Sequence, residues 1–270
     1  MKRKGFDHLS ASGIESFLTC PRKFYLSYVE GVVSPPSMPM TFGKLFHSAA
    51  EGEKVELPEG DLFYNNLLME NAVKSYNKYR DSLPMQPDYT VREACFKLNT
   101  PYKPIIGYID VVDQYGEELV FGDLKTTQRN AGAHYLDSIQ YKLYTLALHG
   151  DNANPFNRKR RVEVVALRKS GKVDVEAYSD FVGDKYLELS RMMTVETLLF
   201  IAHCESSNFF PANMRSCNPQ PGQGFKCGFN DLCSNNPGAG VRTLAKIALE
   251  TEGFEKKEQK EHVPVFEEEL

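Results

Sequence analysis

The sequence predicts an α/β fold, with a core of strands surrounded by helices. Three observations support this prediction: helical spacing of apolar residues up to residue 80, strand-like segments from residue 89, and an amphipathic helical segment after each strand pair. The chain has 270 residues, of which 41 % are hydrophobic and 25 % are charged. This composition allows a sizeable core and excludes collagen-like, coiled-coil and wholly disordered chains.

The first part of the chain is expected to be helical. The segment Ser12–Glu15 matches a capping box at a helix start, and Ser10 is a competing N-cap. Apolar residues then recur at helical spacing on both sides of Pro21. The proline-rich segment Val33–Pro39 is expected to be a loop. Two more helices are predicted, from about Phe42 to Glu53 and over residues 61–80.

Strands and helices are expected to alternate in the middle of the chain. Tyr89–Leu98 alternates in polarity, and Ile105–Val112 and Glu118–Lys125 form a predicted hairpin around the turn Asp113–Glu117. The elements predicted after the hairpin are a helix at Leu136–Leu148, a strand pair at Arg161–Leu167 and Val173–Tyr178 around Ser170-Gly171, and a long helix at Lys185–His203. From Phe210 onward Pro, Gly, Asn and Cys dominate.

Charge and hydropathy limit the classes of partner and compartment. The net charge is −4, which gives no overall basic signature but permits a local basic groove for nucleic acid. No apolar run is long enough to cross a membrane and no signal peptide is visible. We therefore expect a cytoplasmic protein without a membrane partner. In that reducing compartment the six cysteines are not expected to form structural disulfides.

The predicted hairpin carries the residues that point most clearly to chemistry. Asp110 ends its first strand, and Asp123-Leu124-Lys125 ends its second. Because side chains alternate along a strand, Asp123 and Lys125 share one face. A tight turn brings Asp110 beside Asp123, and two adjacent carboxylates are stable when a cation lies between them. Oxygen ligands suit Mg²⁺ or Mn²⁺, which can polarise a phosphodiester and activate water.

Two other segments agree with such a site. Gln140 and Tyr144 are four residues apart and share one face of the following helix. His47 lies at the end of the segment Thr41–His47 in a predicted helix. The alternative is that Tyr144 is a core residue and Gln140 a surface residue. Taken alone, His47 is better explained as a hydrogen-bonded histidine of the helix than as a metal ligand.

As an ordered set, these motifs resemble the RecB-like branch of the PD-(D/E)XK nuclease superfamily. The matching blocks are Gly43-Lys44-Leu45-Phe46-His47, Gly107-Tyr108-Ile109-Asp110, Asp123-Leu124-Lys125 and Gln140-x-x-x-Tyr144, within residues 9 to 235. The literal Pro-Asp is absent, because Ile109 precedes Asp110. The resemblance implies a restriction-endonuclease-like core, with a mixed central sheet flanked by helices. Residues 1–250 would form this single nuclease domain, with a helical insertion at about 42–85 and an acidic flexible tail at 251–270.

The resemblance also implies roles for the matching residues. His47, Asp110, Asp123 and the Leu124 carbonyl would bind Mg²⁺ or Mn²⁺. Lys125 would be the catalytic lysine, and Gln140 and Tyr144 would position the active site and DNA. Glu93, on the preceding strand, is a candidate further acidic residue, although the sequence favours an exposed strand residue with no role in the site.

The cysteines form a second candidate metal site. Cys227 and Cys233 are six residues apart, and Cys217 lies ten residues before Cys227. Spacing alone suggests a metal but names no fourth ligand. The resemblance to iron–sulfur nucleases of the AddB and CRISPR-associated exonuclease type names Cys20 and implies a 4Fe–4S cluster, with a structural Zn²⁺ as the alternative. The long interval after Cys217 departs from the family pattern, and His203 or Cys204 could replace it.

The expected activity is divalent-metal-dependent DNA hydrolysis, by an exonuclease acting on single strands or DNA ends. Candidate pathways are recombination, repair, phage DNA processing and CRISPR adaptation. Because no P-loop pattern occurs, a helicase, recombination or CRISPR partner would be a separate chain. The alternative function is a non-catalytic DNA-end-binding or interaction module with the same fold and cluster. Candidate DNA contacts are Arg22, Lys23, Lys44, Arg129 and Tyr141.

Overall fold

A mixed sheet forms the centre of the molecule. The computed structural model describes residues 7–58, 64–127, 133–149, 159–168, 173–217, 227–257, 264 and 266–270. Among these residues, seven strands form one sheet in the order β7-β6-β5-β4-β3-β9, with β1 paired to β4. The strand bounds are β1 Leu9–Ser10, β3 Tyr89–Asn99, β4 Ile105–Tyr115, β5 Glu118–Thr127, β6 Lys159–Arg168, β7 Asp174–Phe181 and β9 Phe266–Glu269. The predicted α/β class with a mixed sheet is confirmed, since β5 pairs in parallel with β6 and antiparallel with β4.

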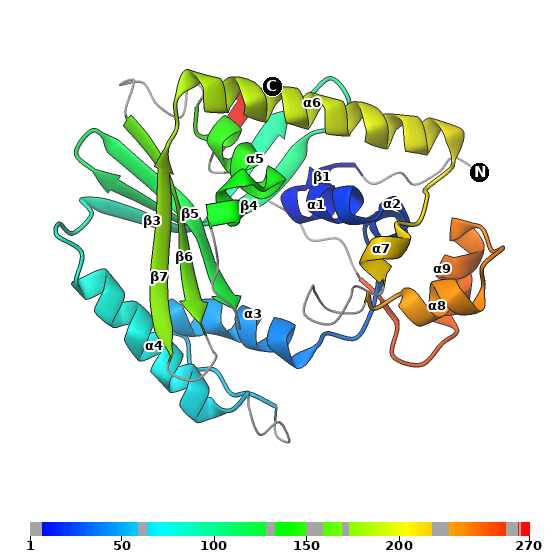
Figure 1. The fold of residues 1–270 in the computed structure, drawn as a ribbon, viewed down its shortest axis with the longest axis horizontal. Helices are drawn as coiled ribbons and strands as arrows, with labels where there is room; N and C mark the ends of the chain where they lie inside the picture. Colours follow the sequence, from blue (N-terminus) through cyan, green and yellow to red (C-terminus); the bar gives the residue numbers. More distant parts are fainter. Residues whose placement is uncertain are drawn as a thin grey trace.

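Helices cover both faces of the sheet (Figure 1). The bounds are α1 Ala11–Thr19, α2 Pro21–Phe24, α3 Met38–Ala50, α4 Asn66–Asp81, α5 Ile139–Ala147, α6 Asp184–Ser207, α7 Met214–Cys217, α8 Asn230–Asn235 and α9 Val241–Leu249. The largest apolar cluster joins α1, α5 and α6 to one face of the sheet. A second cluster joins α3 and α4 to β5 and β6 through Leu124 and Val165 on the other face. The sheet is therefore the middle of three layers.

The N-terminal helix begins earlier than the capping box predicts. Ser10 is the N-cap of α1, and its hydroxyl accepts a hydrogen bond from the backbone N–H of Gly13 at 2.9 Å. The capping-box prediction at Ser12 is wrong, because the strand β1 delivers Ser10 in the extended conformation that an N-cap needs. The helical run is also divided: α1 stops before Pro21, and α2 is followed by a π-helical turn at Tyr25–Val29.

The predicted loop at Val33–Pro39 is shorter in the structure. Val33 pairs with Glu255 in a small two-stranded sheet formed by β2 (Val32–Val33) and β8 (Glu255–Lys256). The helix α3 already begins at Met38. Pro39 fits its first turn because the backbone N–H groups there have no partner inside the helix.

The predicted hairpin is confirmed, but both of its strands are longer. Tyr115 pairs with Glu118, so the turn consists of Gly116 and Glu117. Gly116 has φ +56°, a conformation that glycine adopts without strain. Asp113 therefore lies within β4 rather than in the turn, and Asp110 lies in the middle of the strand rather than at its end. The predicted turn at Ser170-Gly171 lies outside the described residues.

The acidic C-terminal segment is not a simple tail. β9 pairs in parallel with β3, with Phe96 opposite Phe266, and Glu268 is buried. Lys97 Nζ lies 2.5 Å from a carboxylate oxygen of Glu267, and hydrogen bonds from Lys97 hold the pKa of Glu267 below its ordinary value. The prediction of a flexible tail is thus wrong for residues 266–269, because β3 offers a free edge that composition does not reveal. The helix α9 lies before this segment and is not predicted from the sequence.

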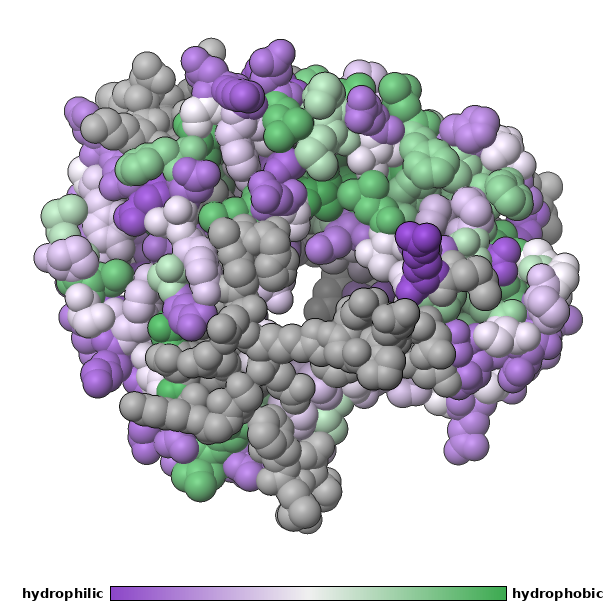
Figure 2. All heavy atoms as spheres, viewed as in Figure 1, coloured by the Kyte–Doolittle hydropathy of each residue, from purple (hydrophilic) through white to green (hydrophobic). Residues whose placement is uncertain are grey.

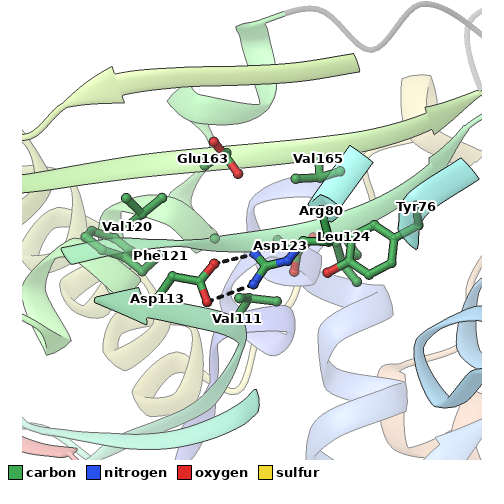
Figure 3. A pocket seen from close by; sticks show the side chains of 11 residues that line it. Tyr76, Arg80, Val111, Asp113, Val120, Phe121, Asp123, Leu124, Glu163 and Val165 are labelled. Carbon is green, nitrogen blue, oxygen red and sulfur yellow. Dashed lines mark hydrogen bonds and ion pairs between the residues drawn. The ribbon is translucent and has the colours of Figure 1, made fainter. Parts of the chain in front are cut away.

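A buried ion pair ties α4 to the sheet. The guanidinium of Arg80 donates to both carboxylate oxygens of Asp113 (Figure 3). The same carboxylate accepts from the Thr90 hydroxyl at 2.6 Å. The Asp113 side chain is 4 % exposed and that of Arg80 is 16 % exposed. This bidentate geometry fixes α4 over β3 and β4, next to the strand that carries Asp123.

We expect Asp113→Ala to destabilise the protein by roughly 3 kcal/mol, because it leaves the Arg80 charge buried without its partner. The free energy of unfolding in urea measures this change. Glu70→Ala is the matched control on the same helix, since its pair with Lys74 is exposed on both sides and contributes little. Equal midpoints for the two variants would contradict a structural role for the buried pair.

The long helix α6 presents an apolar stripe to the outside. Leu189, Met192, Val195, Leu199 and Phe200 are exposed along it, and Figure 2 shows hydrophobic surface along the upper edge, where α6 lies. Within the described residues, no helix has the combination of length and hydropathy that crossing a membrane requires.

Candidate active site

The predicted site lies where two neighbouring strands separate. The pairing of β4 with β5 ends at Val111 and Gly122. Asp110 and Asp123 are the next residue of each strand, and the Asp110 carboxylate accepts a hydrogen bond from the backbone N–H of Leu124 at 2.8 Å. At this point the Asp110 side chain, rather than a backbone carbonyl, accepts the hydrogen bond from β5. The two carboxylates lie side by side in the opening, as the sequence predicts.

Glycine at position 122 allows the strand to pass its other neighbour closely. A Cβ atom there would lie 1.7 Å from the carbonyl oxygen of Glu163 on β6. Any other residue would push β5 away from β6 and displace Asp123, which follows directly. The small residue before the aspartate is therefore a requirement of the backbone that positions the site.

One side of Asp123 is held by a polar network from α5. Gln140 Nε2 donates to Asp123 Oδ1 at 3.2 Å and to the Tyr144 hydroxyl at 2.5 Å, and Tyr144 donates to the same carboxylate oxygen at 3.3 Å. Lys125 forms an ion pair with Asp123 Oδ2 and donates to Gln140 Oε1 at 3.1 Å. The spacing of Gln140 and Tyr144 thus places both on Asp123.

His47 reaches the opposite side of the opening from α3. Its Nε2 lies 3.0 Å from the Leu124 carbonyl oxygen, and its Nδ1 lies 3.4 Å from Asp110 Oδ2. Gly43 allows α3 to approach the strand, since a Cβ there would lie 3.1 Å from Thr126 Oγ1. The structure therefore brings together His47, Asp110, Asp123, Leu124, Lys125, Gln140 and Tyr144.

Burial and neighbouring charges set the protonation of these groups. Desolvation raises the pKa of Asp110 well above its ordinary value, and the negative charge of Asp123 adds to this. Burial lowers the pKa of His47, opposed by Asp123, so its ring is neutral and offers a lone pair. Burial also acts to lower the pKa of Lys125, but the adjacent Asp123 outweighs it and the pKa is raised. Two carboxylates that repel each other beside a neutral imidazole form an environment suited to a divalent cation.

Glu93 joins the site from β3, although the sequence does not distinguish it from an exposed residue. Ligand atoms of His47, Glu93 and Asp110 all lie within 4.8 Å of one another. Glu93 has φ +46°, unusual for a residue with a side chain. The signal in the sequence is that Glu93 lies in the strand predicted just before the hairpin. The register of β3 with β4 then sets Glu93 opposite Asp110.

The structure sorts the predicted DNA contacts into three groups. Tyr141 is fully buried with its ring 5.6 Å from that of Tyr144, so its prediction as a DNA contact is wrong. The Tyr141 side chain points from α5 into the core. Lys44 is exposed on α3, and Arg22 and Lys23 are partly exposed on α2. Arg129 lies outside the described residues.

The four predicted cysteines converge at the other end of the molecule. Cys20 precedes α2, and its sulfur accepts a hydrogen bond from the Asn213 backbone N–H at 3.3 Å. The Cys227 N–H donates to the Cys217 carbonyl at 3.0 Å. Burial raises the pKa of the Cys217 thiol, and the nearby thiols of Cys20, Cys227 and Cys233 raise it further.

The alternatives to Cys217 lie elsewhere. Cys204 is buried in α6 within the main apolar cluster, and burial alone raises its pKa. His203 is exposed on the same helix. The geometry therefore favours Cys217 as the partner of Cys20, Cys227 and Cys233.

Comparisons with known proteins identify the family of this chain. The family model of the PD-(D/E)XK nuclease superfamily matches residues 8–233. No protein with a curated description matches significantly. A solved structure of a presumptive exonuclease from Eubacterium rectale aligns with a TM-score of 0.54 and 14 % identity, over 86 % of this chain and 94 % of that chain, which shows a shared fold. The structure of SSO0001 aligns at a TM-score of 0.36 and 14 % identity, over 73 % of this chain and 78 % of that chain. The family match over most of the length shows that the chain belongs to the PD-(D/E)XK nuclease superfamily.

Proposed function

We propose that the protein is a divalent-metal-dependent DNA exonuclease that acts on single strands or DNA ends. The observation that carries the proposal is the convergence of His47, Asp110, Asp123 and the Leu124 carbonyl beside Lys125. Recombination, repair, phage DNA processing and CRISPR adaptation are the processes in which such an activity is used. A helicase or another protein of these processes would be its partner.

The donor atoms fit Mg²⁺ or Mn²⁺. Metal–oxygen bonds of about 2.1 Å place neighbouring ligands of an octahedral ion about 3.0 Å apart. His47 Nε2 and the Leu124 oxygen lie at hydrogen-bond distance, 3.0 Å, in the absence of an ion, and both face the same opening as Asp110. Asp123 Oδ2 is buried and faces the Lys125 ammonium, with which it forms an ion pair. His47, Asp110, Asp123 and the Leu124 carbonyl would therefore hold the ion.

Each residue of the site has its own role in phosphodiester hydrolysis. When bound, the ion would act as a Lewis acid and would lower the pKa of a water molecule bound to it. The Lys125 ammonium, held by Asp123 and Gln140, faces the opening and stabilises negative charge on the phosphate. Gln140 and Tyr144 keep Asp123 oriented. The reaction adds water across one P–O bond, with the water oxygen on phosphorus and its proton on the leaving oxygen.

Positive charge on two helices supports a nucleic-acid substrate. Figure 1 shows α3 and the pair α1 and α2 at separate places beside the sheet. Lys44 on α3 and Arg22 and Lys23 on α2 supply positive charge at both places.

We propose a 4Fe–4S cluster as the second cofactor, held by Cys20, Cys217, Cys227 and Cys233. A single Zn²⁺ would need thiolates about 3.8 Å apart, from Zn–S bonds of about 2.3 Å. The resemblance of the cysteine pattern to that of iron–sulfur nucleases supports the cluster, and metal analysis of the purified protein separates it from zinc. Its role would be structural, because hydrolysis transfers no electrons.

A cleavage assay tests the proposed nuclease. The wild type and Asp123→Ala are incubated with Mn²⁺ or Mg²⁺ and single-stranded DNA labelled separately at each end, beside a circular strand. We expect progressive label release by the wild type, an uncut circle, and no cleavage by Asp123→Ala. The order of label release gives the polarity.

Two outcomes would change the proposal. A cut circle would replace the exonuclease by an endonuclease. No cleavage by a folded wild type with its cluster would favour a non-catalytic module that binds DNA ends or another protein, and DNA binding would then be measured directly.

A further inference from the structure

A guanidinium from α2 reaches the group of four cysteines. The helix α2 follows Cys20 directly, and the backbone N–H of Arg22 donates to the Pro211 carbonyl at 3.1 Å. This hydrogen bond docks the start of α2 against the segment that leads to the later cysteines. The Arg22 side chain then forms a hydrogen bond with Cys233. Arg22 therefore contacts a thiol supplied by the other end of the chain.

The Arg22 side chain lacks the partners that a guanidinium usually has in a protein. Its Nε is buried and has no hydrogen-bond partner, and no ion pair with a carboxylate is described for it among the residues that the structure covers. A buried N–H donor without an acceptor costs stability. Cysteines become thiolates when they bind a metal. The four cysteines would then supply the negative charge that the guanidinium lacks.

Two thiols are already under the influence of this charge. Burial raises the pKa of Cys233, and the positive charge and hydrogen bond of Arg22 act against that rise. Burial likewise raises the pKa of Cys217, and the charge of Arg22 opposes it there too. Lys23, the next residue on α2, is not among the main groups that act on either thiol. The geometry of α2 thus directs one of two neighbouring cations at the cysteines.

A backbone donor completes the polar surroundings of the sulfurs. The N–H of Asn213 donates to Cys20 Sγ at 3.3 Å, and the carbonyl of Asn213 accepts from the Cys217 thiol at 3.4 Å. Asn213 therefore holds two of the cysteines in place but carries no charge. Arg22 adds both a donor and a positive charge.

We propose that Arg22 is a positioning residue of the cysteine site, where its guanidinium donates to sulfur and supplies the counter-charge for metal-bound thiolates. This inference rests on the proposed 4Fe–4S cofactor and not on the nuclease activity. It gives Arg22 a role that its predicted contact with DNA does not require. Hydrogen bonds to the sulfurs and the net charge nearby set the reduction potential of such a cluster. Loss of Arg22 should therefore disfavour the reduced cluster, which carries one more negative charge, and should weaken metal binding.

Arg22→Met tests the assignment in the full-length protein loaded with iron. Methionine keeps an unbranched apolar side chain and removes the charge and the N–H donors. We expect the reduction equilibrium of the cluster to shift at least tenfold toward the oxidised form, which lowers a one-electron potential by about 59 mV. We also expect iron to pass to a chelator on the order of tenfold faster. A redox titration followed by visible absorbance measures the first effect, and chelator kinetics measure the second.

Lys23→Met is the matched control, because it removes the same charge from the neighbouring position of the same helix. Its reduction potential and its rate of iron release should equal those of the wild type. Arg22→Lys keeps the charge and should restore most of the potential, which a merely structural role of Arg22 does not predict. The potential serves as a measure of charge at the site, since the proposed role of the cluster is structural. Urea unfolding shows that each variant is folded.

The outcomes separate this inference from the proposed cofactor and from the nuclease. A wild-type potential and rate of iron release in Arg22→Met would overturn the role of Arg22, and so would equal changes in Arg22→Met and Lys23→Met. A wild type that holds zinc would overturn the cluster. Faster zinc release from Arg22→Met than from Lys23→Met would then support the role of Arg22, and equal release would overturn it. DNA cleavage enters none of these measurements, so failure of the proposed nuclease would leave their result unchanged.

Discussion

Replacing Lys125 by methionine should abolish DNA cleavage and leave divalent-metal binding in place. Lys125 contributes no ligand atom, but its ammonium lies between Asp123 and Gln140 at the opening. Methionine is unbranched like lysine and only one atom shorter, and it removes the positive charge that faces the phosphate. Loss of such a group costs on the order of 10²–10³-fold in rate. Single-turnover cleavage and Mn²⁺ calorimetry measure the two effects separately.

A second buried lysine provides the control. Lys142 lies on α5, is 1 % exposed, and has its Nζ 4.8 Å from the centre of the Tyr186 ring. Burial lowers its pKa, and it is not part of the network on Asp123. Lys142→Met should therefore cleave DNA at the wild-type rate. Equal rates for Lys125→Met and the wild type would rule out the catalytic role.

Cys233→Ala should lose the iron, unfold more readily and bind DNA more weakly. Its sulfur would help to link residue 20 to residue 233, and closing a loop of about 200 residues stabilises a protein by up to about 5 kcal/mol in the chain-entropy account. An apolar cluster of Leu26, Val32, Phe229 and Leu244 joins the same two ends of the chain. We therefore expect a weakened but folded protein, with the opening between β4 and β5 still able to bind Mn²⁺.

The control is another buried thiol. Cys204 is 2 % exposed and packs in the main apolar cluster, away from the four converging cysteines. Cys204→Ala should keep its iron and lose only a packing contribution of about 1 kcal/mol. Iron analysis, the visible spectrum and urea unfolding compare the variants. A colourless wild type with one zinc per chain would replace the cluster by zinc, and full iron content in Cys233→Ala would exclude this ligand.

Local patterns in the sequence determined most of the elements and half of the site. Alternation and β-branched residues predict the hairpin, and the four-residue spacing of Gln140 and Tyr144 places both on one helix face. Those patterns suffice because hydrogen bonds inside a helix or across a short turn join residues that are close in sequence. The roles of His47 and Cys20 came from a family resemblance, since nothing in local spacing links them to residues 77 or more positions away.

Only the tertiary structure decided the remaining features. Whether Tyr141 is exposed depends on what packs against α5, and periodicity does not tell a core aromatic from a stacking one. The pairing of β9 with β3 joins segments about 170 residues apart. The glutamate-rich sequence of β9 gives no indication of this pairing. Glu93 enters the site because β3 lies beside β4 with one particular register. Register and long-range pairing are set by how all the apolar faces are buried together, so they emerge only when the whole chain is folded.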